Sequence, residues 1–260
     1  MTPQPSIPLH PAARAQNMIT IASGKGGVGK TVLAISIAQA FAKAGQSTLL
    51  FDGDLGLANI DIQLGIMPEH DLGSVITGRV SVEEAITKFE GGGFDILAGK
   101  SGSGALAELS KERLERVRKE LMGLANAYDR VIVDLGAGIH NEARILAASS
   151  GTVVVIATDE PTSLTDAYAF IKVTNAQYPG NDIRILVNMA QSAREGKRTF
   201  ETLRKACESF LKISPPLAGI VRTDAKVKDA IRAQSPLLTR HPNSNAAMDI
   251  EAVVKSLLAD

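Results

Sequence analysis

Short apolar runs alternate along this chain with longer segments whose apolar residues recur every three or four positions. The short runs are continuously apolar, which is typical of parallel strands buried on both faces of a sheet. The longer segments have the spacing of helices that cover such a sheet. The predicted strands are 18–22, 47–51, 94–98, 130–133, 152–157, 183–188 and 217–221, and the predicted helices are 30–44, a long one from 110, 162–176, 199–211, 224–233 and 245–258, with short ones near 62–67 and from 81. This alternation predicts an α/β fold with a single doubly wound, mostly parallel β-sheet flanked by helices.

The first 17 residues differ from the remainder, because four prolines interrupt them and they show neither pattern. They also lack the apolar segment of a signal peptide. We therefore expect a flexible N-terminal extension over 1–17 and one domain over 18–260, since no linker or change of composition divides the rest. No apolar run reaches the roughly 18 to 20 residues that cross a bilayer.

Charge and cysteine content narrow the classes of partner and setting. The chain has 28 Lys and Arg against 28 Asp and Glu, which argues against an electrostatic hold on nucleic acid by the whole chain. The single cysteine, Cys207, excludes an internal disulfide and fits a cytoplasmic location. A local basic cluster is nevertheless present, formed by Arg194, Lys197, Arg198, Arg204 and Lys205.

A glycine-rich stretch joins the first predicted strand to the first predicted helix. It fits the G-x-x-x-x-G-K-[ST] pattern of a phosphate-binding loop, which makes the fold a P-loop NTPase of Rossmann-like type. Glycines let successive backbone N–H groups point at an anion, and the following helix adds its positive end. Lys30 is expected to reach the β- and γ-phosphates, and the Thr31 hydroxyl is expected to ligate Mg²⁺. The predicted nucleotide-binding residues here are Gly24, Lys25, Gly26, Gly27, Val28, Gly29, Lys30 and Thr31.

Aspartates follow two further predicted strands, where parallel strands present ligand sites. Asp52 and Asp54 come after the strand STLLF, and a spacing of two points both carboxylates the same way, so that one can organise Mg²⁺ and the other can orient an attacking water. Asp134 closes the apolar strand RVIV, as the Walker B aspartate that holds Mg²⁺ does. Gly138, four residues later, suits a switch segment that moves with the γ-phosphate. Asn188 ends another strand with an amide that can read a base edge.

The stretch KGGVGKT, residues 25–31, resembles the deviant Walker A motif of the MinD/ParA class of ATPases, and the resemblance covers about residues 18–258. It implies ATP or ADP with Mg²⁺ as cofactors and an ATP-dependent homodimer in which Lys25 reaches the partner's phosphates. DGDLGLANID, residues 52–61, resembles the switch I segment of that class, which assigns Asp54 to the attacking water and Asp52 to the Mg²⁺ side. The class also places an asparagine at the position of Asn188 to read adenine. Its members often read D-x-P-A-G where this chain has Asp134-Leu-Gly-Ala-Gly, so Gly136 is expected to loosen that turn.

Three stretches narrow the resemblance to the flagellar-number regulators FlhG and FleN: FDGDLGLANID, EPTSLTDAY (160–168) and VNMAQSAREG (187–196). That branch implies a slow, partner-stimulated ATPase that controls the number or placement of polar flagella. The implied partners are an FlhF-like GTPase, flagellar switch (C-ring) proteins or a flagellar transcription regulator. The implied location is the cytoplasm, with recruitment to the cell pole or the inner membrane face.

Two departures from that branch and two other functions keep alternatives open. Residues 10–17 do not form the N-terminal DQAxxLR-type motif, and the charges of the final predicted helix sum to negative, so we expect it to pack on the core rather than to anchor in anionic membrane. A ParA-like partition ATPase would bind nonspecific DNA and distribute a plasmid, a chromosome or a chemosensory cluster, through the basic cluster named above. A relative that carries a metal or cluster is disfavoured, because Cys207 has no Cys-x-x-Cys partner.

Overall fold

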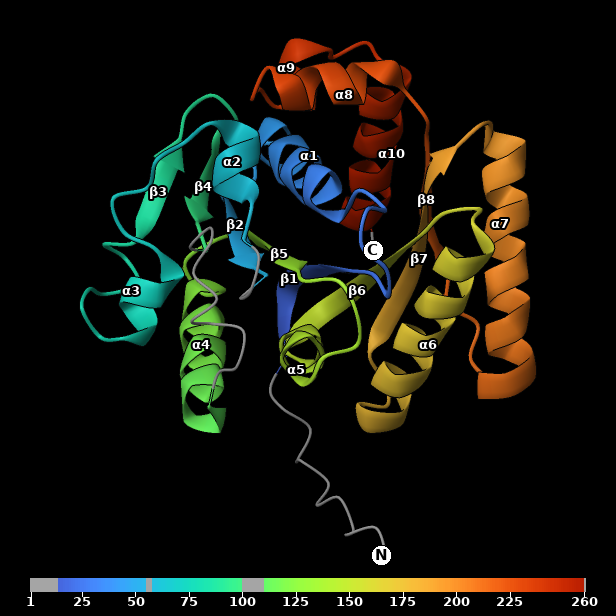
Figure 1. The fold of residues 1–260 in the computed structure, drawn as a ribbon, viewed down its shortest axis with the longest axis horizontal. Coiled ribbons are helices and arrows are strands. Elements are labelled where there is room, and N and C mark those ends of the chain that lie inside the picture. Colours follow the sequence, from blue (N-terminus) through green and yellow to red (C-terminus); the bar gives the residue numbers. More distant parts are fainter. Residues whose placement is uncertain (1–13, 55–57, 100–109, 260) are drawn as a thin grey trace, which may run out of the picture.

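In the computed structural model, one eight-stranded sheet with helices on both faces forms the framework of the chain (Figure 1). The structure describes residues 14–54, 58–99 and 110–259. The strand order is β3-β4-β2-β5-β1-β6-β7-β8, and every neighbouring pair is parallel except β3 with β4. The strands are β1 (Ala15–Ala22), β2 (Thr48–Gly53), β3 (Ile86–Phe89), β4 (Phe94–Leu97), β5 (Arg130–Leu135), β6 (Ser150–Ala157), β7 (Asp182–Ala190) and β8 (Leu217–Arg222). The predicted fold class is confirmed.

Two layers of helices cover the sheet, because apolar side chains leave both of its faces. Successive strand residues point to opposite faces, so Met18 and Ile21 of β1 belong to different core clusters although both are fully buried. One layer consists of α1 (Lys30–Lys43), α8 (Ala225–Arg232), α9 (Leu237–Arg240) and α10 (Asn245–Ala259), and the other of α4 (Lys111–Leu124), α5 (Asn141–Ala148), α6 (Pro161–Gln177) and α7 (Ala193–Ala206), which continues as a π-helical turn (Cys207–Leu211). The short helices α2 (Ile60–Leu64) and α3 (Leu72–Ile76) lie between β2 and β3 in the sequence.

The first strand begins three residues before its predicted start. Ala15 pairs with Ser150 of β6, and the Asn17 amide donates to the carbonyl oxygens of Ala125 and Tyr128, at 2.7 and 2.8 Å. Residues 15–17 therefore belong to the sheet and not to the predicted extension. The sequence does not show this, because Gln16 and Asn17 break the apolar run and the Asn17 contacts are made to residues more than 100 positions away. Residues 1–13 of the predicted extension lie outside the described part of the chain.

The short helix predicted from Ser81 is wrong, although its capping interactions are present. The backbone N–H of Ser81 donates to Glu84, and that of Glu84 donates to the Ser81 hydroxyl. The chain then turns into β3, which pairs with β4 around the glycines 91–93, and the rings of Phe89 and Phe94 meet edge to face at 5.4 Å. A hairpin on an existing sheet edge has outweighed a capping signal that closes only one turn.

The last helix packs on the core, as its charge pattern predicts. The apolar face of α10, with Ile250, Val253 and Val254, is buried against β8 and α1. Its exposed side chains include Lys255 and Glu251, which pairs with Lys43 at the end of α1 at 2.6 Å. Within the described ranges, no helix combines the length and the apolar composition that crossing a membrane requires.

Candidate nucleotide site

The phosphate-binding loop lies between the central strand β1 and the N-terminus of α1, with its backbone held by segments distant in the sequence. The Gly138 N–H, in the turn after β5, donates to the Ser23 carbonyl at 3.0 Å. The Asn188 side-chain amide, on β7, donates to the Val28 carbonyl at 2.8 Å. Within the loop, the Ser23 hydroxyl donates to the Lys25 carbonyl at 2.7 Å. The loop is thus fixed in a curled form before any ligand contact.

Gly29 is the N-cap of α1 and has a left-handed backbone, with φ of 88°. Only glycine adopts this conformation without steric cost. A Cβ at this position would also lie 2.5 Å from the Asn188 Nδ2 atom, which holds the loop. The glycine of the motif is therefore required both for the backbone turn and for the loop's contact with β7.

Gly29→Ala is expected to lower nucleotide affinity by about tenfold or more, because it combines about 1–2 kcal/mol of backbone strain with displacement of Asn188. Isothermal titration with ATP measures the change. The matched control is Gly45→Ala at the other end of α1, where φ is 81° and a Cβ would meet no atom within 4 Å. The control carries the same strain and should leave nucleotide affinity at the parental value; equal affinities for both variants would contradict the assigned role of the loop.

Lys25, the additional lysine of the loop, contacts the start of α6. Its Nζ atom donates to Glu160 Oε2 at 2.5 Å and to Thr162 Oγ1 at 2.9 Å. Both partners belong to the stretch EPTSLTDAY, so the loop and that stretch form one structural unit. Sequence reasoning singled out each of them but did not predict that they touch, since the contact joins residues 135 and 137 positions apart.

The metal end of the candidate site is formed by Thr31 and Asp134. The Thr31 side chain is hydrogen-bonded to the Asp134 carboxylate, whose Oδ1 atom is buried and has no hydrogen-bond partner. Burial raises the pKa of Asp134 to about 7, although Thr31 and the charge of Lys30 lower it. An unpartnered carboxylate oxygen beside a threonine hydroxyl is a donor set that suits Mg²⁺. The residues present therefore fit the predicted cation.

Asp52 lies beside Asp134 but its oxygens are used for another purpose. Oδ1 accepts the N–H of Asp54 at 3.2 Å, and Oδ2 accepts the N–H groups of Asn59 and Ile60 at 3.2 and 3.3 Å. Burial and the charge of Asp134 raise the pKa of Asp52 to about 8, against the opposite effect of the N–H groups of Ile60 and Asp54. In this structure Asp52 holds the backbone of Asp54 and the start of α2 through these hydrogen bonds. Its placement on the Mg²⁺ side stays a prediction.

Lys30 lies at the centre of these charges. It is 9% exposed, and burial lowers its pKa, while the carboxylates of Asp134 and Asp54 partly offset that effect. A buried ammonium with carboxylates near it is stabilised further by phosphate oxygens. The structure thus brings Lys30, Thr31 and Asp134 together, with Asp54 beside them.

A cleft of about 750 Å³ extends from this cluster to the carboxyl ends of β7 and β8. It is large enough for a nucleotide. Arg222 at the end of β8, with Thr223 and Asp224 after it, also lines the cleft. Sequence reasoning did not predict a site role for Met189, although this residue lies in the stretch VNMAQSAREG and has a left-handed φ of 57°. It also missed the inner face of α8, which carries no motif. The base-end lining consists of Asn188, Met189, Gln191, Val221, Arg222, Thr223, Asp224, Val227, Lys228, Ile231, Ala246 and Ile250.

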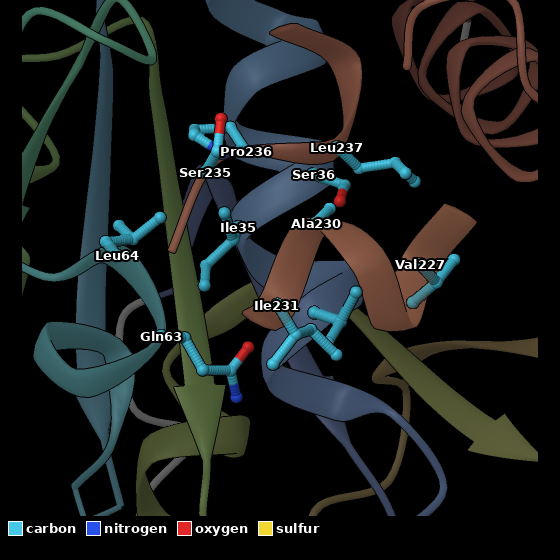
Figure 2. Close-up of a pocket in the computed structure, with 11 residues that line it drawn as sticks. Ile35, Ser36, Gln63, Leu64, Val227, Ala230, Ile231, Ser235, Pro236 and Leu237 are labelled. Carbon is cyan, nitrogen blue, oxygen red and sulfur yellow. The ribbon is translucent and has the colours of Figure 1, made fainter. Parts of the chain in front are cut away.

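A second, much smaller crevice adjoins the cleft between α1, α2 and α8 (Figure 2). Its volume is about 20 Å³, and Ile35, Leu64 and Ala230 are among its apolar lining residues. The buried Ser36 hydroxyl in its wall has no hydrogen-bond partner. The crevice has room for about one water molecule and is too small for a substrate.

Comparisons with known proteins agree with this geometry. Residues 19–237 match the family described as the CobQ/CobB/MinD/ParA nucleotide binding domain. The chain is 33% identical to the antiactivator FleN of Pseudomonas aeruginosa, over 96% of this chain and 87% of FleN, and 29% identical to the flagellum site-determining protein YlxH of Helicobacter pylori, over 93% and 81%. It superposes on the MinD-type fold in the MinC:MinD cell division protein complex of Aquifex aeolicus with a TM-score of 0.78 and 27% identity, covering 94% of this chain and 96% of that chain.

Proposed function

This chain belongs to the CobQ/CobB/MinD/ParA nucleotide-binding family and is an ATPase, and from that premise we propose that it is a Mg²⁺-ATP-dependent switch that dimerises and controls the number or placement of polar flagella. The observation that carries the proposal is the joint placement of Lys25, Lys30 and Asp54 around one phosphate-binding loop. The flagellar role is supported by the similarity to FleN and to YlxH.

The phosphate end supplies the groups that ATP hydrolysis needs. Lys30 and the loop N–H groups neutralise the β- and γ-phosphates, and Asp54 orients the attacking water and accepts its proton. Mg²⁺, held by Thr31 and Asp134, supplies further positive charge to the phosphate oxygens when bound. The products are ADP and phosphate. A switch must remain in its ATP-bound state long enough to act. We therefore expect turnover of the isolated protein to be slow and stimulated by a partner.

The base end favours adenine through Asn188. One N–H of its Nδ2 group donates to Val28 at 2.8 Å, and its Oδ1 atom is an acceptor that can face a base. Adenine presents an amino donor where guanine presents a carbonyl acceptor, so the Asn188 oxygen attracts the first and repels the second. We expect ATP to bind at least about tenfold more tightly than GTP, a difference of roughly 1.4 kcal/mol. Competition titration against a fluorescent ATP analogue measures this, and equal displacement by both nucleotides would contradict the assignment.

For dimerisation, Lys25 must exchange Glu160 and Thr162 for the phosphates of a partner subunit. The exchange is energetically accessible, because the side chains of Lys25 and Glu160 are 35% and 63% exposed. Exposed ion pairs contribute only about 0–1 kcal/mol. A triphosphate offers more negative charge than one carboxylate, so ATP bound in the partner competes for Lys25.

The flagellar role is tested in the organism of origin. A strain that lacks this chain should show an altered number or position of flagella by electron microscopy. The parental gene should restore the normal pattern, and a Lys30→Ala gene should not. Flagella of normal number and position in the deletion strain would contradict the flagellar role while leaving the ATPase assignment intact.

The alternative, a partition ATPase on nonspecific DNA, has weaker support from the structure. Arg204 of the basic cluster pairs with Glu201 and Glu208, at 2.5 and 3.0 Å, and these carboxylates offset its positive charge. We expect no shift of a nonspecific DNA duplex by ATP-loaded protein at low salt, the condition under which nonspecific binding is tightest. Tight binding that weakens steeply with salt, and that is lost in an Arg194→Ala, Lys197→Ala, Arg198→Ala variant, would favour the partition function instead.

A further inference from the structure

Asp54 directly follows β2 and Gly136 directly follows β5, and the two residues lie side by side past the ends of these strands. In the parallel register Asp52 pairs with Asp134 and Gly53 with Leu135, so the next residues, Asp54 and Gly136, face one another. A Cβ at Gly136 would lie 3.1 Å from Asp54 Oδ1, 3.2 Å from its Cγ and 3.4 Å from Oδ2. The whole carboxylate of Asp54 therefore lies against the α-carbon of Gly136.

The backbone at Gly136 does not itself require glycine. Among the glycines of this turn Gly138 has a left-handed φ of 102°, whereas Gly136 lies outside the left-handed region. Any residue could adopt the backbone conformation of Gly136. A side chain there would therefore act only by filling the space beside the Asp54 carboxylate. A separation of 3.1 to 3.2 Å is tighter than ordinary contacts to a Cβ, so a side chain here must displace either Asp54 or the turn.

Because Gly136 has no side chain, the Asp54 carboxylate can lie beside it, at the phosphate end of the cleft. The carboxylate of Asp54 is close enough to Lys30 to raise its pKa against the effect of burial. Asp54, Lys30 and Ala137, the neighbour of Gly136, all line the cleft. A displacement of Asp54 away from Gly136 therefore also changes its position relative to the γ-phosphate.

We propose that Gly136 is a positioning residue for hydrolysis: its missing side chain sets where the Asp54 carboxylate lies. This inference rests on the proposed role of Asp54 in orienting the attacking water. The glycine is needed for room rather than for a looser turn.

The test compares Gly136→Ala with the parent in steady-state ATP hydrolysis. We expect kcat to fall by about threefold to tenfold, because the Asp54 carboxylate must shift by a few tenths of an ångström, less than the roughly 1 Å that costs about 100-fold, with the KM for ATP unchanged within about twofold. The control is Gly123→Ala on the exposed side of α4, where a Cβ meets no atom within 4 Å and the parental kcat should persist. An unchanged kcat, or an equal loss of kcat and ATP affinity, would overturn the proposal.

A double-variant cycle keeps the test decisive if Gly136→Ala also perturbs the turn. In an Asp54→Ala background, the addition of Gly136→Ala should change kcat by less than about twofold, because the group that Gly136 positions is already absent. A further large loss in the double variant would show that Gly136 acts through another group and would overturn the inference. Parental hydrolysis by Asp54→Ala alone would instead refute the proposed role of Asp54, which separates the two failures.

Discussion

Lys30→Ala is expected to lower the affinity for Mg²⁺-ATP by about 100-fold or more, or roughly 3 kcal/mol, and to abolish measurable hydrolysis. Lys30 is nearly buried at the first position of α1, where the loop and the helix N-terminus direct positive charge at the same place. Removing the ammonium also takes away a positive charge that interacts with the carboxylates of Asp134 and Asp54, so they repel the phosphates more strongly. Isothermal titration measures the affinity.

The matched control is Lys43→Ala at the other end of the same helix. Lys43 is exposed and pairs with Glu251 on the surface of α10. That variant should bind ATP with the parental affinity and lose at most about 1 kcal/mol of stability. If both lysine variants bind ATP equally, the phosphate site has been placed at the wrong end of α1.

Asp54→Ala is expected to have the opposite pattern: ATP binds normally, and kcat falls by about 100-fold to 10,000-fold. The phosphate loop and Lys30 are untouched, so affinity is kept, while the attacking water loses the carboxylate that orients it. The ATP-bound dimer should then persist for longer than in the parent. Asp54→Asn, which keeps the size of the side chain and removes its charge, should show the same loss, and a rate near the parental value in both variants would exclude a role for this carboxylate in hydrolysis.

The parts of the site that follow from local sequence were predictable. Gly29 has the left-handed backbone that its place in the motif requires, and Lys30 and Thr31 begin α1. Asp134 lies at the end of an apolar strand. Each of these features depends on neighbours in the chain. The parallel order of the sheet then brings Asp52 next to Asp134, as continuous apolar strands lead one to expect.

The contacts that complete the site depend on packing between distant segments, which a single sequence does not encode in any short pattern. The pair of Lys25 with Glu160, the hold of Asn188 on Val28, and the contact of Asp54 with Gly136 each join residues more than 80 positions apart. Local signals were also overruled: the capping box at Ser81 is formed, yet the chain continues into a hairpin strand because an open sheet edge lies beside it. In each case packing between distant segments determined which contact or element formed.

The central claim is that ATP draws two subunits together through Lys25, and light scattering coupled to size-exclusion chromatography tests it most directly. Asp54→Ala protein, in which ATP should persist, is run with Mg²⁺-ATP and with Mg²⁺-ADP. The double variant that carries both Asp54→Ala and Lys25→Ala is run with Mg²⁺-ATP. We predict a dimer with ATP only, and a monomer that still binds ATP once Lys25 is removed. A dimer that is indifferent to the nucleotide, or one that survives Lys25→Ala, would contradict the proposed switch.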